Sequence, residues 1–218
     1  MPMSAPESIE SLLTRDLPRE LVLAIQASFD AGAQLAHDVS KNARSGHKAH
    51  VVGMMRHFQI GEAFYDALEA TGGQPTPLRG NALVIGKAGM FNVARMSIKD
   101  GPWYNARRSV QRRALAELNR TISQLVQPDL FGERQEVPTK ASVFFVAIFA
   151  KNLAESPERP VDIQIAVPDP EMRTWLYTKS VTEFLQCYSK PVEQLDKAKP
   201  ALKANRTRKQ SNEGGTSS

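Results

Sequence analysis

The stretch ASVFFVAIFAK, residues 141–151, decides the fold class of this chain. From Val143 to Ala150 it contains no polar side chain, so it lacks the alternation that marks a strand with one solvated face. Its branched and aromatic side chains favour a β-strand, and an uninterrupted apolar run is typical of a strand that is covered on both faces. We therefore predict that this stretch is the central strand of a sheet.

The segments on either side of it predict three more strands. Residues 82–87 and 90–98 are rich in β-forming side chains, and the sequence GKAG between them is typical of a hairpin turn. Residues 161–167 alternate between branched apolar side chains and others, which places the apolar ones on one face of a strand. Together these segments predict a four-stranded, mostly antiparallel sheet.

Helical spacing of apolar side chains predicts the remaining elements. Two N-terminal helices are expected between Arg19 and Thr71 with a break at Ser45-Gly46, and two further helices over 105–126 and 171–188. The order is then ααββαββα and the fold class α+β. The predicted divisions are a lead over 1–18 with a short helix that ends near Pro18, a single α+β domain over 19–189 (helical part 19–72, sheet part 80–189), and a disordered basic tail over 190–218.

The net charge of +5 is concentrated in that tail. Residues 190–218 hold seven Lys or Arg and three Asp or Glu, which accounts for +4 and leaves +1 for residues 1–189. The tail also lacks apolar periodicity, as expected of a disordered segment. An anion site in the folded part must therefore depend on a local cluster of cations.

Cysteine usage and hydropathy predict the compartment. A single cysteine, Cys187, excludes an internal disulfide, which is typical of a reducing environment. The first residues lack a basic stretch followed by an apolar run, and no stretch of about 18 apolar residues occurs. We therefore expect a cytoplasmic protein without a membrane span.

The helix predicted over 105–126 carries five arginines and one acid, Glu117. Arginine suits phosphate because its planar guanidinium donates two parallel hydrogen bonds. The preceding strand adds two more cations. The residues predicted to contact phosphate are Arg95, Lys99, Arg108, Arg112, Arg113 and Arg120. The alternative is that these side chains only form a solvated helix face.

Helical geometry assigns faces to this segment. An unbroken helix has one apolar face that includes Val110, Ala114 and Leu118, and it places Arg112 on the opposite, solvated side. The same geometry turns Arg107 toward the core, where it would need an acidic or carbonyl partner.

No catalytic signature is present. The phosphate loop GxxxxGK[ST] and the nucleophile turn GxSxG are both missing from the sequence. His47, His50 and His57 share a helix face but have no acid at ligand spacing, so we predict no metal site. A helix-turn-helix over 34–71 is an alternative to ordinary helix packing there. A divergent metal-dependent nuclease using Asp162 lacks the expected second acid and lysine; we predict no cofactor and no catalytic residue, and whether any activity exists stays open.

The peptide Gln127-Pro128-Asp129-Leu130-Phe131 stands in a segment otherwise typical of a solvated loop. It resembles the peptide with which many bacterial DNA-processing proteins bind the replication sliding clamp, whose pattern is Gln, any residue (often Leu), Asp or Ser, Leu, Phe. The match holds at four of five positions and departs at Pro128. The resemblance implies that Gln127 contacts the rim of a groove while Leu130 and Phe131 bury in an apolar pocket. The alternative is that both apolar side chains fold back onto their own chain.

These observations predict a non-catalytic, nucleic-acid-associated bacterial protein, with DNA as the expected ligand and a sliding clamp or other protein as a second partner. Phosphate contacts from the arginines and the tail should weaken as salt rises. Two other classes stay open. One is an assembly subunit, or homo-oligomer, that packs through Met54, Met55 and Phe58. The other is the nuclease that would use Asp162.

Overall fold

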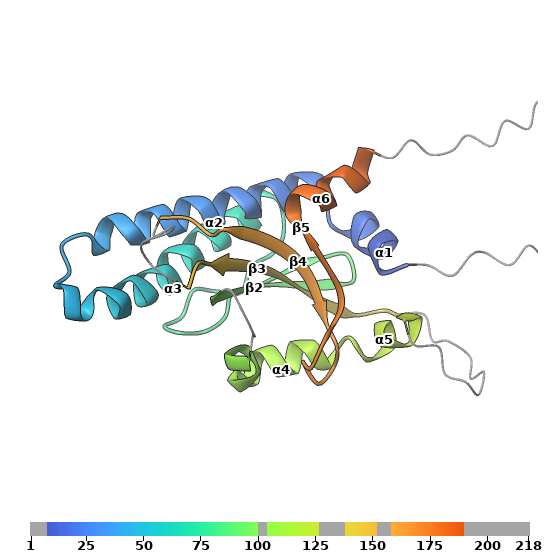
Figure 1. The fold of residues 1–218 in the computed structure, drawn as a ribbon. Coiled ribbons are helices and arrows are strands. Elements are labelled where there is room, and N and C mark those ends of the chain that lie inside the picture. Colours follow the sequence, from blue (N-terminus) through green and yellow to red (C-terminus); the bar gives the residue numbers. More distant parts are fainter. Residues whose placement is uncertain (1–7, 100–103, 127–137, 152–157, 190–218) are drawn as a thin grey trace, which may run out of the picture.

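The computed structural model describes residues 8–99, 104–126, 138–151 and 158–189 (Figure 1). The first elements are the helices α1 (Ile9–Asp16), α2 (Arg19–Ser40) and α3 (Ser45–Ala70). They are followed by β1 (Ile85–Ala88), β2 (Phe91–Lys99), the 3-10 helix η1 (Tyr104–Arg108), α4 (Val110–Glu117) and α5 (Arg120–Val126). The last are β3 (Ala141–Phe149), β4 (Asp162–Pro168), β5 (Trp175–Ser180), α6 (Val181–Gln186) and the 3-10 helix η2 (Cys187–Ser189).

The five strands form one mixed sheet in the order β1-β2-β3-β4-β5. β2 and β3 run parallel, from Phe91 opposite Ala141 to Lys99 opposite Phe149. The other three neighbouring pairs are antiparallel. The α+β class is therefore confirmed. The predicted sheet differs in two respects: it had four strands where the structure has five, and it did not include the parallel pairing of β2 with β3.

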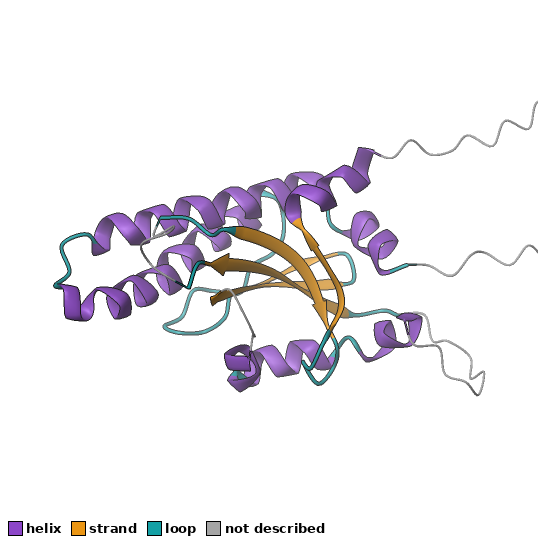
Figure 2. Ribbon diagram, viewed as in Figure 1, coloured by secondary structure: helices purple, strands orange, loops and turns teal. Residues whose placement is uncertain are grey.

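The strand that decided the fold class lies at the centre of the sheet, as predicted. Phe145 on one face of β3 belongs to a large core with residues of α1, α2 and α3. Phe144 and Val146 on the other face belong to a smaller core that includes Leu115 and Ala116 of α4. Figure 2 shows the same layering, with α2 and α3 on one side of the strands and α4 and α5 on the other.

The helices α2 and α3 pack against each other as an antiparallel hairpin (Figure 1). Their contact is close at Gly32, where an added Cβ would lie 2.7 Å from the Cα of Ile60. The N-terminal helix α1 joins the same core, because Leu12, Leu13 and Leu17 are buried. Within the described ranges, no helix is both long and apolar enough to cross a membrane.

The helix predicted over 171–188 is wrong in its first half. Residues Trp175–Ser180 form β5, which pairs antiparallel with β4, and only Val181–Gln186 are α-helical. The hairpin between the strands is built by Asp169, whose carboxylate accepts hydrogen bonds from the backbone N–H groups of Arg173 and Thr174. Met172 in this turn has a φ of 54°, a left-handed conformation that is rare for a residue with a side chain.

The unbroken helix predicted over 105–126 is also wrong. Its first turn is 3-10, α4 begins after Ser109, whose hydroxyl accepts a hydrogen bond from the Arg112 N–H, and α4 ends at Glu117. The break before α5 contains Asn119, which is fully buried. Its amide donates to the Pro168 carbonyl (2.9 Å) and accepts from the Ser142 N–H (2.7 Å), which ties the break to the sheet.

The break changes which face of α4 is buried. The predicted apolar face fails, because Val110 is 70% exposed and Ala114 is also exposed. Leu115 and Ala116 are the buried residues, and Arg112, predicted on the solvated side, lies between them around the helix. Arg107, predicted to face the core, is exposed.

Two predicted features lie outside the described residues. One is the docking peptide with Gln127, Leu130 and Phe131, and the other is the basic tail over 190–218.

Candidate anion-binding pocket

A cavity of about 270 Å³ lies beside the second half of β2, which extends beyond its pairing with β1. β1 is opposite residues 91–94 of β2 only, and no other described strand flanks the rest of β2 on that side. We call this cavity the arginine pocket. Its walls come from α3, β2, α4 and the end of β3, and the residues that line it are Gly53, Arg56, His57, Arg95, Ser97, Ile98, Lys99, Arg112 and Phe149.

Strand alternation explains why β2 supplies polar groups here. Arg95, Ser97 and Lys99 occupy every second position, so they share one face of the strand. Phe91 and Val93 are on the same face and belong to the core with α2 and α3. The face that is apolar at the start of β2 therefore becomes cationic toward its end.

Arg95 is the most deeply placed cation of the pocket. Its side chain is almost completely covered, with the residue 3% exposed, and its terminal nitrogen donates a hydrogen bond to the His57 carbonyl. Burial, and then repulsion from Arg112, lower its pKa from 12.5 to about 10. The group is still protonated at neutral pH. Gly61 provides the space for it, because a Cβ there would lie 2.8 Å from the Arg95 guanidinium.

Arg112 and Arg56 reach the same pocket from two helices. Burial lowers the pKa of each guanidinium. Arg56 lies flat over Phe149, 3.9 Å from the ring centroid, which is a cation–π contact. The buried Nε atoms of Arg95 and Arg112 have no hydrogen-bond partner among the described residues. Such groups are costly to bury unless something accepts from them.

The charged side chains among the described residues that line the pocket have one sign, and the carboxylate of Glu62 lines an adjoining hollow. Its described lining includes four cations, Arg56, Arg95, Lys99 and Arg112, and no carboxylate. Guanidinium groups that converge from separate elements without an acid between them suit an anion with several oxygen atoms, such as a phosphate. The arrangement can therefore hold an anion.

His57 adds a titratable group to this pocket. Burial, then the positive charges of Arg95 and Arg112, lower the pKa of its imidazole below 6.5. On its other side, His57 lines an adjoining hollow with Glu62 and Arg79. The imidazole is therefore neutral at pH 7 while no anion is bound.

A bound dianion should reverse this effect on His57. It would offset the two guanidiniums and raise the pKa of the imidazole, so binding takes up a proton and affinity should rise as the pH falls through neutral toward the lowered pKa of the unbound protein's His57. Sulfate is the probe, because its own charge does not change in this range, and calorimetry measures its affinity. His57→Asn should flatten the pH profile, whereas His47→Asn, near the start of the same helix, should not. A profile that stays steep in His57→Asn contradicts this role of His57.

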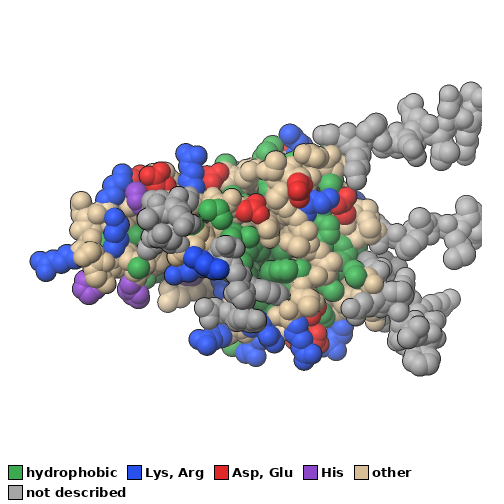
Figure 3. Space-filling view, viewed as in Figure 1, with side chains coloured by type: hydrophobic (Ala, Val, Ile, Leu, Met, Phe, Trp, Pro, Cys, Tyr) green, Lys and Arg blue, Asp and Glu red, His purple; other side chains and the backbone are tan. Residues whose placement is uncertain are grey.

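The structure brings together three of the six cations predicted to contact phosphate: Arg95, Lys99 and Arg112. The other three, Arg108, Arg113 and Arg120, are exposed near or on α4 and α5. Figure 3 shows Lys and Arg side chains along the lower edge of the molecule, over α4. Arg120 forms an exposed ion pair with Glu117 (3.5 Å), which contributes little in solvent.

Sequence reasoning missed Arg56 and gave His57 another role. The missed signal was a four-residue repeat in α3: Val52, Ile60 and Phe64 are buried, and Arg56 occupies the position between the first two. A cation in a core-facing repeat indicates a buried charge that needs a partner. His57 was grouped with two other histidines, and within the described residues no set of three His, Cys, Asp or Glu side chains could hold a metal ion.

Asp162 is not among the residues that line the arginine pocket. It begins β4, and its carboxylate accepts a hydrogen bond from the Gln164 amide (2.8 Å).

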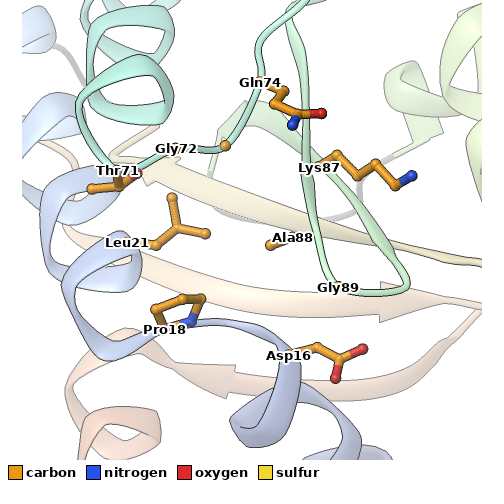
Figure 4. A pocket seen from close by; sticks show the side chains of 10 residues that line it. Asp16, Pro18, Leu21, Thr71, Gly72, Gln74, Lys87, Ala88 and Gly89 are labelled. Atoms are coloured by element: carbon orange, nitrogen blue, oxygen red, sulfur yellow. The ribbon is translucent and has the colours of Figure 1, made fainter.

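A separate hollow of about 380 Å³ lies between α1, the end of α3 and the β1–β2 hairpin (Figure 4). Burial raises the pKa of Asp16 there, but hydrogen bonds from Arg15 and the Met90 N–H outweigh it and hold that pKa below its ordinary value. Asp16 therefore links α1 to the turn of the β1–β2 hairpin.

Comparisons with protein-family models, curated proteins and solved structures find no match for this chain.

Proposed function

We propose that the protein binds nucleic acid through its phosphates, with one phosphate group held in the arginine pocket. The observation that carries this proposal is the convergence of Arg56, Arg95, Lys99 and Arg112 on one cavity whose described lining has no carboxylate. Keeping Arg95 buried costs folding free energy, as its lowered pKa indicates. A bound anion would recover that cost, because it accepts hydrogen bonds that the described residues do not.

Exposed arginines near the pocket extend the basic surface. Arg107 and Arg108 end η1, and Arg113 follows the pocket residue Arg112 on α4. All three are exposed, so they can contact further phosphates along a strand. One phosphate in a cavity together with others on an open surface is an arrangement that favours a polyanion over a small phosphate ester.

Affinity for a DNA duplex should fall steeply with salt, and the exposed arginines should contribute to the slope. Each phosphate contact adds about 0.9 to the negative slope of log K against log salt concentration. Replacing Arg108 and Arg113 together by Ala should therefore weaken binding and reduce that slope by about two. Fluorescence anisotropy over a series of salt concentrations measures both quantities.

Arg19→Ala serves as the matched control, because Arg19 is an exposed arginine at the start of α2, away from the pocket. It should leave the slope unchanged. A wild-type protein that binds no DNA at low salt would overturn the proposal. If the double variant keeps the wild-type slope, Arg108 and Arg113 do not contact phosphates.

Protein assembly is a second candidate function, and one observation favours it. Met54 is 45% exposed and lines a hollow together with His50 and Phe58. Methionine adapts to many partner surfaces. A large, DNA-independent oligomer in light scattering, without retention on DNA, would favour this candidate. The docking peptide at Gln127, Leu130 and Phe131 stays a prediction of its own.

A further inference from the structure

We infer that the arginine pocket takes the terminal phosphate of a nucleic acid strand, a phosphomonoester, and that the hollow beside it takes the attached nucleoside. This inference rests on the proposed function and narrows it from any phosphate of the strand to its end. The second hollow, called here the nucleoside hollow, has a volume of about 610 Å³. Its lining residues are Ala49, His50, Gly53, Met54, His57, Phe58 and Asn81.

The charge of the pocket fits a phosphomonoester better than an internal phosphodiester. An internal phosphate carries one negative charge and two free oxygens. A terminal phosphate carries about −1.5 to −2 at pH 7 and three free oxygens. The pocket holds Arg56, Arg95, Lys99 and Arg112. Because these cations repel one another, as the effect of Arg112 on the pKa of Arg95 indicates, the more highly charged ligand gains more from the site.

The pocket is built from both sides of the sheet. Its walls come from both faces of the sheet edge, since Arg95 and Lys99 lie on the α3 side of β2 while Arg112 comes from α4 on the other side. At about 270 Å³ the pocket is smaller than the usual range for drug-sized ligands, about 300–1,000 Å³. It has room for a phosphate group, and a larger ligand would extend into the hollow beside it.

The nucleoside hollow lies where the remainder of that nucleotide would go. It shares Gly53 and His57 with the arginine pocket, so the two cavities adjoin. Met54 and Phe58 offer apolar surface to the face of a base, and Asn81 offers an amide to its polar edge. Phe149 in the arginine pocket is already covered by Arg56, which leaves the base no aromatic surface there.

Gly53 stands at the border between the two cavities, and this gives a direct test. A Cβ added at Gly53 would meet no atom of the described residues beyond its own stretch of α3 within 4 Å, so the space beside it is open. Gly53→Leu should therefore fold, because leucine favours a helix more than glycine does. Its side chain would enter the border region and exclude the nucleotide. Gly46 also has nothing within 4 Å of its Cβ and lies on α3 but lines neither cavity, so Gly46→Leu is the matched control.

The experiment compares single-stranded oligonucleotides of one sequence that carry a 5′-phosphate, a 3′-phosphate or hydroxyl groups at both ends. Fluorescence anisotropy should give a preference of about tenfold or more for one phosphorylated end, as expected when hydrogen bonds to a charged group are gained. The two phosphorylated strands identify which end binds. The preference should be lost in Gly53→Leu and kept in Gly46→Leu, with thermal unfolding to show that both variants are folded.

The outcomes separate this inference from the proposed function. Equal binding of all three strands by the wild-type protein overturns the terminal-phosphate inference and leaves the proposed function standing. Binding of none of them overturns both. An end preference that survives in folded Gly53→Leu overturns the assignment of the nucleoside hollow.

Discussion

Replacing Arg95 by Met should make the protein more stable and abolish its binding of phosphorylated strands. Arg95 is 3% exposed and burial lowers its pKa to about 10, about 2.5 below its ordinary value. That difference corresponds to roughly 3 kcal/mol spent on keeping the charge buried. Methionine is unbranched and adaptable enough to fill most of the same space. We expect the free energy of unfolding to rise by about 1–3 kcal/mol, which shifts Tm upward by roughly 2–10 °C.

Binding should respond in the opposite direction. Removing one member of a buried charged contact costs about 2–5 kcal/mol, so affinity for a phosphorylated strand should fall by about 100-fold or more. Chemical denaturation and anisotropy measure the two quantities on the same samples. Arg113→Met is the control, because it replaces an exposed arginine of α4 and should change stability by less than about 0.5 kcal/mol. Arg95→Lys keeps a charge but loses the planar fork, so it should not restore full affinity.

The pH dependence of the free energy of unfolding tests the buried charge of Arg95 in a second way. The folded-state pKa of Arg95 is lowered, so its burial cost is present below about pH 10 and is relieved as the pH rises from 10 toward 12.5. The stability advantage of Arg95→Met should therefore shrink over that window. If Arg95→Met is instead destabilised by several kcal/mol, the guanidinium has a carboxylate partner in addition to the His57 carbonyl. Asp100, which follows Lys99 in the sequence and lies outside the described residues, would be the first carboxylate to test.

Local signals in the sequence were sufficient for the central strand and for the β1–β2 hairpin. The run from Val143 to Phe149 has no polar interruption. The hairpin forms as predicted, but its turn lies later than expected: of the sequence GKAG only Gly89, at a φ of 53°, is in the turn, and the three residues before it belong to β1. β5 was missed because Leu176, Phe184 and Leu185 also fit helical spacing. The turn before it gave no warning, since its left-handed residue is a methionine where a glycine would have marked the turn.

The arginine pocket could be predicted only in part, for a similar reason. Alternation along β2 links Arg95 with Lys99, and both were predicted to act together. Arg112 lies in the same pocket because α4 is a short, separate helix. The break at Asn119 allows α4 to bury a different face from the one that the apolar residues of α5 would predict for a continuous helix. A helical projection over 22 residues averaged two helices into one and gave the wrong face. The tertiary contact that causes the break involves residues 23 and 49 positions away, which local spacing does not reveal.

Asn119→Ala should therefore damage both stability and the arginine pocket. The Asn119 side chain accepts from the Ser142 N–H and donates to the Pro168 carbonyl, and all these contacts are buried. Its loss leaves two buried backbone groups without that partner, at a cost of about 1–3 kcal/mol each. We expect unfolding free energy to fall by about 2–5 kcal/mol. We also expect weaker anion binding. Without the Asn119 side chain the end of α4 loses its contact with the sheet, so Arg112 on this helix would no longer be held in the pocket.

The measurements are chemical denaturation for stability and sulfate calorimetry for the pocket, at a temperature where the variant is fully folded. Gln124→Ala is the control, because Gln124 is an exposed amide on α5 and should affect neither quantity. The two effects have separate meanings. If Asn119→Ala is destabilised but its folded form binds sulfate as tightly as the wild type, then α4 is positioned by its other contacts, such as the packing of Leu115 and Ala116 and the hydrogen bond from Ser142 to the Leu115 carbonyl. In that case the packing of α4 on β3, and not the buried amide, fixes the geometry of Arg112.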